Sequence, residues 1–246
     1  SDGRLSVSLL QRENEALDGR VRFDARLRLP NVERHAYLFV GRDNEREAVT
    51  DQPDALSQQQ RLIIQTPQQQ SFFAGLGMTW LDLFDVRLGF RGGLKAYAQA
   101  RYRHTLAVAD DDVLAFSQTF FWTVQDRIGS TTALSFERAL MPALTVRWLN
   151  SATITQRRDE FEWFSLVGLY RSFDEERLLS FEGLATGVHG APVDVSDLGL
   201  RLKWSQRVWR PWIVGEALVG HFWPREDPSR PRDRRWGYGL GLTMKF

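Results

Sequence analysis

The sequence predicts an all-β fold, an antiparallel up-and-down β-barrel whose strands cross a membrane. Apolar and polar residues alternate along many short stretches, most clearly in 20–29, where charged residues oppose apolar ones such as Val21, Phe23 and Leu27. Turn residues separate these stretches, at a spacing of about 15 to 20 residues in the second half of the chain. No stretch shows the helical period strongly enough to compete with this interpretation. No run of about 18 apolar residues occurs, which excludes a transmembrane helix, whereas a barrel strand needs only alternate residues to be apolar.

The last stretch, 236–246, has one apolar face and one face of small or polar residues. Its aromatic residues lie at both ends with aliphatic ones between, which suits a strand that crosses about 25 Å of hydrocarbon. A soluble β-sandwich could also end on an amphipathic strand, so this stretch alone leaves that class open. The apolar face carries Trp236, Tyr238, Leu240, Leu242, Met244 and Phe246, and the other face Gly237, Gly239, Gly241, Thr243 and Lys245.

This stretch resembles the C-terminal strand of Gram-negative outer-membrane β-barrels. The resemblance implies a bacterial outer-membrane location, contact with outer-membrane lipid and lipopolysaccharide, and recognition by the barrel-assembly machinery during biogenesis. The implied assembly signal is Tyr238, Leu240, Leu242, Met244 and Phe246. Stretches 117–122, 200–210 and 222–228 are similar to an uncharacterised family of bacterial outer-membrane barrels, a similarity that concerns architecture and supplies no substrate.

Composition fits one barrel domain spanning 1–246, in which 1–18 is either a periplasmic extension or the first strand. The net charge of +1 favours no class of partner, and no nucleic-acid motif occurs. The absence of cysteine excludes disulfides and thiolate metal sites. An exported protein needs a signal peptide and none begins at Ser1, so we expect a mature form from which it has been removed.

About fourteen strands are expected, or twelve if the first stretch lies outside the barrel or two stretches fuse. The polar segment 43–70 predicts a long surface loop, with a strand extension at 62–64 left open. Gln118 interrupts an apolar face without explanation, and 160–171 carries aromatics on both faces, as a bulge or a lumen-lining aromatic would allow. The expected strands are 4–11, 20–29, 34–42, 72–80, 84–91, 97–106, 113–125, 130–140, 143–155, 160–171, 176–186, 197–207, 212–223 and 236–246.

Placing the apolar faces outward puts many charged residues inside the barrel, because Arg or Lys facing lipid near the midplane costs about 2 to 4 kcal/mol. Basic residues outnumber acidic ones in this set. Either the charges pair across the lumen and close it, or they line a water-filled path that favours anions. The expected lumen-facing residues are Arg20, Arg22, Asp24, Arg26, Arg28, Asp85, Arg87, Arg91, Gln99, Arg101, Arg103, Glu137, Arg147, Glu182, Arg201, Lys203 and Lys245.

The favoured function is therefore a small passive channel with a basic lumen, without cofactor, metal or catalytic residues. The alternative is a non-conducting barrel that anchors or partners an envelope assembly through 1–11 or its outer loops. A third class, a lipid-acting barrel enzyme, needs a Ser and a His within hydrogen-bond reach. The histidines are scattered outside any such signature, and His104 shares an apolar face with Tyr102 and Leu106, as an interfacial residue would.

Overall fold

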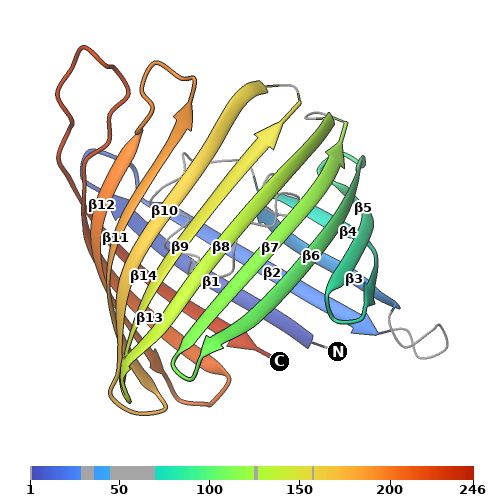
Figure 1. The fold of residues 1–246 in the computed structure, drawn as a ribbon, viewed down its shortest axis with the longest axis horizontal. Helices are drawn as coiled ribbons and strands as arrows, with labels where there is room; N and C mark the ends of the chain where they lie inside the picture. The colour runs from blue at the N-terminus through green and yellow to red at the C-terminus, as the bar shows by residue number, and fades with distance from the viewer. Residues whose placement is uncertain (1, 29–35, 45–69, 125–126, 157) are drawn as a thin grey trace.

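Fourteen antiparallel strands close into one barrel in the computed structural model, which describes residues 2–28, 36–44, 70–124, 127–156 and 158–246 (Figure 1). None of these residues belongs to a helix long and apolar enough to cross a membrane. The strands are β1 (Asp2–Arg12), β2 (Asp18–Arg28), β3 (Ala36–Asn44), β4 (Gln70–Trp80), β5 (Phe84–Arg91), β6 (Lys95–Ala109), β7 (Asp112–Thr123), β8 (Arg127–Met141), β9 (Leu144–Thr155), β10 (Arg158–Ser172), β11 (Arg177–His189), β12 (Asp197–Arg207), β13 (Ile213–Phe222) and β14 (Arg235–Lys245).

The barrel closes where the first strand meets the last. β1 pairs antiparallel with β14 from Arg4 opposite Lys245 to Arg12 opposite Gly237, while its other edge pairs with β2. Gly3 and Phe246 exchange two backbone hydrogen bonds, of 2.6 and 2.9 Å. Every other strand pairs with its neighbours in the sequence, so the count is fourteen and the twelve-strand alternative is excluded.

Both termini lie at one end of the barrel, called here the terminus end, and the opposite end is the long-loop end (Figure 1). The described connections at the terminus end, such as 81–83, 110–111 and 142–143, are short. The connections 190–196 and 223–234 lie at the long-loop end, in agreement with membrane barrels in which short turns lie at one end and longer loops at the other. The strand extension predicted at 62–64 lies outside the described residues.

The apolar residues that alternate along the sequence lie on the exposed outer face of the barrel, and the residues between them lie on the shielded inner face. On β1, Leu9 is 47% exposed, whereas its neighbour Ser8 is 4% exposed. On β14, Leu240 is 62% exposed, and the glycines beside it face inward.

Some strand boundaries were predicted wrongly. Asp43 and Gln70, placed in the long loop by the sequence, belong to β3 and β4, where Asp43 pairs with Ser71 and Gln70 with Asn44. β2 likewise begins at Asp18, before the expected start at 20, because Asp18 pairs with Leu10 of β1.

The two irregular stretches of the sequence have separate structural causes. On the outer face, the Gln118 amide donates a hydrogen bond to the Ser130 hydroxyl (2.7 Å) and accepts one from Thr132 (2.6 Å), which satisfies it locally. In β10, the register against β9 shifts between Arg158 and Phe161, and Phe164 faces inward, 8% exposed. Both explanations left open for 160–171, a bulge and an inward aromatic, therefore apply.

The inner face also carries apolar packing. The Phe222 ring is 0% exposed and lies on glycines of its own strand and of the two neighbouring strands, where a Cβ added to Gly199, Gly220 or Gly237 would approach it within 2.6 to 2.9 Å. The glycine face of β14 thus accommodates a large side chain of β13. Two buried clusters line the lumen: Leu10, Leu149, Phe164, Leu166, Leu184, Leu218 and Phe222 on one side, and Tyr37, Phe39, Phe73, Tyr97 and Phe121 on the other.

Candidate functional site: the lumen wall

Strand alternation brings the charged residues predicted for the lumen to the inner face. Along β2 they alternate with outward residues such as Val21 and Leu27, which are 42% and 49% exposed. The inward positions are Arg20, Arg22, Asp24, Arg26 and Arg28 on β2, Asp85, Arg87 and Arg91 on β5, Gln99, Arg101 and Arg103 on β6, Glu137 on β8, Arg147 on β9, Glu182 on β11, Arg201 and Lys203 on β12, and Lys245 on β14.

The most deeply buried pair of the wall is Glu182 with Arg201. They are opposite each other in the β11–β12 register, and both side chains are 0% exposed. Arg201 donates from Nε (2.9 Å) and Nη2 (2.6 Å) to Oε2 of Glu182, while the Tyr170 hydroxyl donates to Oε1 (2.7 Å). Next to this pair, Lys203 Nζ lies 3.7 Å from Oε1 of Glu216 on β13.

A second centre is built on Asp85 of β5. Its Oδ2 accepts hydrogen bonds from the Tyr37 hydroxyl (2.7 Å) and the Thr79 hydroxyl (3.2 Å). Its Oδ1 lies 2.9 Å from Nε of Arg87 and 3.7 Å from Nη2 of Arg101. One carboxylate therefore faces two guanidinium groups.

Ion pairs between described strand residues run mainly along the wall. Arg22 pairs with Asp43 on the adjacent β3, and Arg147 with Glu137 on the adjacent β8 at 2.9 Å. Arg20–Asp18 (3.1 Å) and Arg26–Asp24 (3.9 Å) each lie within β2. Such pairs hold charged side chains against the sheet instead of drawing opposite walls together.

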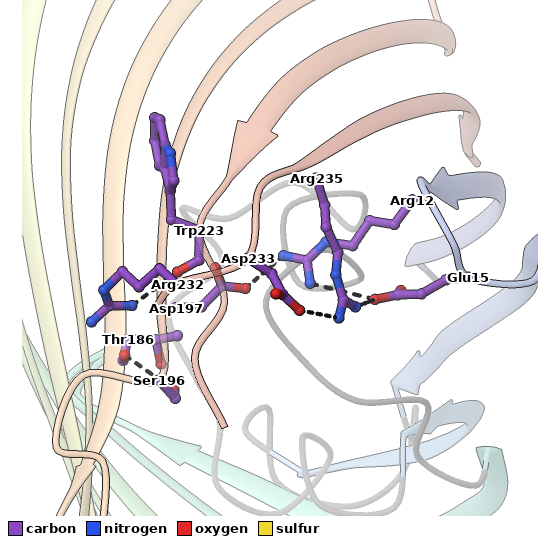
Figure 2. A network of polar contacts seen from close by, with 9 residues as sticks. All are labelled: Arg12, Glu15, Thr186, Ser196, Asp197, Trp223, Arg232, Asp233 and Arg235. Atoms are coloured by element: carbon purple, nitrogen blue, oxygen red, sulfur yellow. Dashed lines mark hydrogen bonds and ion pairs between the residues drawn. The ribbon is translucent and has the colours of Figure 1, made fainter. Parts of the chain in front are cut away.

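The long-loop end has a different arrangement, in which ion pairs tie separated elements together (Figure 2). Arg12 of β1 donates to Asp197 of β12 at 2.6 Å, across the two strands that separate them, and its guanidinium lies 4.6 Å from the Phe222 ring. Arg235 bridges Glu15 (2.7 Å) and Asp233 (3.0 Å).

The 223–234 connection is held at the same place. Arg232 donates hydrogen bonds to the carbonyl oxygens of Trp223 (2.9 Å, Figure 2) and Val195 (2.8 Å). It thereby links the 223–234 connection to 190–196, the connection that precedes β12. Together with the ion pairs of Arg12 and Arg235, these bonds fasten two long connections to one side of the mouth.

Several wall residues were missed by sequence reasoning: Tyr37, Asp43, Tyr170, Asp197 and Glu216. Alternation alone could have found Asp197 and Glu216, because both share the parity of inward neighbours on their own strands. The residue type of Tyr37 and Tyr170 carried no such signal, because aromatic residues occur on both faces of a membrane barrel. Only the hydrogen-bond partner of each hydroxyl group shows that it belongs to the inner wall. Register across strands, which the sequence does not reveal, supplies that partner.

The described histidines lie away from the inner wall. His104 faces outward and stacks on Tyr102 with ring centroids 6.3 Å apart, and His221 packs on the outer face between Trp223 and Trp236. His189, at the end of β11, lies 3.6 Å from Asp194. Among the described residues, no group of three or more His, Asp or Glu is placed to hold a metal ion; His35 lies outside them.

The predicted assembly residues occupy the outer side of the closing strand. Tyr238 and Leu240 are 58% and 62% exposed, and Leu242 is 37% exposed. Met244 shares their face, and Phe246 follows the strand at 67% exposure.

Comparison with solved structures identifies the architecture. A bacterial polysaccharide outer membrane secretin matches with a TM-score of 0.53 and 11% identity over 100% of this chain and 98% of that one. OmpT of Vibrio cholerae matches with a TM-score of 0.51 and 12% identity, over 100% and 96%. The fold is that of an outer-membrane β-barrel.

A KdgM porin in complex with disordered oligogalacturonate also matches this barrel, with a TM-score of 0.50 and 8% identity over 99% of each chain. At these identities the likeness concerns the fold alone. No protein-family model matches the chain, and no curated protein sequence matches it.

Proposed function

We propose that this barrel is an outer-membrane channel through which small anionic solutes pass passively. The observation that carries the proposal is the course of the ion pairs between described strand residues, most of which lie within one strand or join neighbouring strands and keep charged side chains on the wall. A wall of this kind would present charge to a solute that passes along the lumen.

The sign of the preference is inferred from the exposed basic side chains of β2. Towards the terminus end, Arg26 and Arg28 expose 42% and 79% of their side chains, and their carboxylate partners are 3.9 and 3.7 Å away. Like charges lining a narrow aqueous path concentrate counter-ions by an energy of several kT, which suffices to bias permeation.

Sugar acids are a reasonable class of test solute. One structural neighbour is a porin in complex with disordered oligogalacturonate and another a polysaccharide secretin. Galacturonate and galactose differ mainly in a carboxylate that replaces a hydroxymethyl group, so the pair separates charge from size.

The experiment is uptake of the two sugars into liposomes that contain the purified barrel. We expect galacturonate to enter faster than galactose, and the Arg26→Ser/Arg28→Ser variant to lose most of this preference. Arg138→Ser is the matched control, because Arg138 faces outward beside Asp112 (3.6 Å) and should leave uptake unchanged. Faster uptake of galactose than of galacturonate, or an equal loss of the galacturonate preference in both variants, would contradict an anion preference set by the wall.

A second candidate is a non-conducting barrel that anchors or partners an envelope assembly. The burial of inward side chains favours it, since Arg201, Glu182, Leu149, Leu166 and Phe222 are all less than 2% exposed. Uptake of neither sugar above that of protein-free liposomes would support this role. A lipid-acting enzyme is the third class, and hydrolysis or acyl transfer on lipid substrates would reveal it.

A further inference from the structure

The outer face of the barrel is apolar over most mid-strand positions, with residues such as Leu38, Leu76, Leu88, Leu200 and Leu240 exposed. Four adjacent strands differ, because they carry polar side chains at mid-strand. We name the outer polar patch for its members, Gln118 on β7, Ser130 and Thr132 on β8, Asn150 on β9 and Ser165 on β10.

Apolar side chains frame this patch towards both barrel ends. Phe120 and Ile154 are exposed on its long-loop side, and Trp148 and Val167 on its terminus side, with exposures of 57%, 53%, 47% and 52% respectively. The patch therefore lies within the apolar belt, at a depth where neither lipid headgroups nor bulk water reaches polar atoms.

Three members of the patch are hydrogen-bonded within the chain, and two are not. Gln118 exchanges hydrogen bonds with Ser130 and Thr132. Asn150 and Ser165 are opposite each other in the β9–β10 register, yet among the described residues neither side chain has a hydrogen-bond partner. An amide and a hydroxyl directed at hydrocarbon are costly, because lipid tails offer no donor or acceptor.

Small residues surround the unsatisfied pair. Ala152 on β9 and Ala185 on β11 face outward beside it, and Ala185 pairs with Ser165. A Cβ added to Gly183 would meet only ordinary contacts, the nearest at 3.6 Å. Small and polar residues together are typical of surfaces where proteins meet inside a membrane, since they allow close approach and hydrogen bonds across the contact.

We propose that the outer polar patch is the contact surface for a second copy of this chain, related to the first by a two-fold axis along the membrane normal. Identical chains in one membrane share an orientation, so such an axis brings β7–β10 of one copy against the same strands of the other. The Asn150 amide both donates and accepts, so it is complementary to its own copy. This proposal requires the membrane-spanning barrel and is independent of whether the lumen conducts.

The chain has no cysteine, which makes disulfide trapping in membranes a clean test. We expect the Asn150→Cys variant to form a covalent dimer under mild oxidation, because residues near a two-fold axis approach their own copies closely. Val21→Cys is the matched control: Val21 is an outward mid-strand residue on β2, at the opposite side of the barrel, 42% exposed. It should remain monomeric.

A second measurement keeps the proposal falsifiable if the thiol geometry is unfavourable. Replacing Asn150 by Leu and Ser165 by Ala should raise the dimer dissociation constant in lipid about 3- to 20-fold, while the variant keeps the unboiled gel mobility of a folded barrel. Val21→Ala should change nothing. A monomeric unaltered protein, equal cross-linking at both cysteine positions, or an adduct with a protein of another mass would overturn the proposal.

Discussion

Replacing Glu182 by Gln should destabilise the barrel strongly, because it removes one charge from a fully buried pair and changes the shape of the side chain little. Arg201 would keep its guanidinium at 0% exposure without the carboxylate that now accepts two of its hydrogen bonds. Breaking a buried pair in this way costs about 3 to 5 kcal/mol. Replacing both residues by Met removes both charges together and should cost far less.

The matched comparison is Glu137 with Arg147. This pair also joins opposite residues of adjacent strands on the inner wall, at 2.9 Å, but its side chains are 40% and 26% exposed. Solvent screening limits such a pair to about 1 kcal/mol or less, so Glu137→Gln should be mild.

The assay is the free energy of unfolding in urea, measured for each variant in phospholipid vesicles. The reasoning fails if Glu182→Gln costs no more than Glu137→Gln. It also fails if the double Met variant is as unstable as the sum of its single changes, since burial of an uncompensated charge would then not be the cause.

Three further predictions follow from the packing and the closure. Phe222→Ala should lower the free energy of unfolding by about 3 to 5 kcal/mol, whereas Leu242→Ala on the outer face should cost much less; similar losses would contradict the packing of Phe222 on three glycines. Deleting Phe246 should reduce assembled protein without altering transcript, because its two backbone hydrogen bonds to Gly3 help to close the barrel; unchanged membrane levels would refute this. The unaltered protein should fractionate with outer membranes and migrate differently in detergent gels before and after boiling, and recovery as a soluble monomer without detergent would end the barrel interpretation.

The sequence predicted the barrel because membrane-spanning strands show their two faces directly. In β2 and β14, side chains alternate between the two faces of the wall, so the position of a residue in the strand tells which face it is on. The charged face must be the inner one, because lipid excludes charged side chains. Gln118 is instructive because it breaks the pattern without breaking the strand. Its partners, Ser130 and Thr132, lie on the next strand, and only the register shows that they face it.

Partners within the lumen could not be predicted in the same way. Arg12 and Asp197 are 185 residues apart in the chain and belong to strands that do not pair with each other. Their contact depends on barrel curvature and on the Phe222 ring beneath the guanidinium. Arg201 and Glu182 are opposite only because of the β11–β12 register, which a shift of one residue would have changed.

The central claim is that the inner wall offers anions a path through the membrane. The most direct measurement is the zero-current potential of the unaltered protein in a planar bilayer separating concentrated from dilute KCl. We predict measurable conductance with the dilute side negative, because chloride crosses ahead of potassium, and a smaller potential after Arg26 and Arg28 are changed to Ser. A positive dilute side, a potential unmoved by these substitutions, or no conductance at all would contradict it.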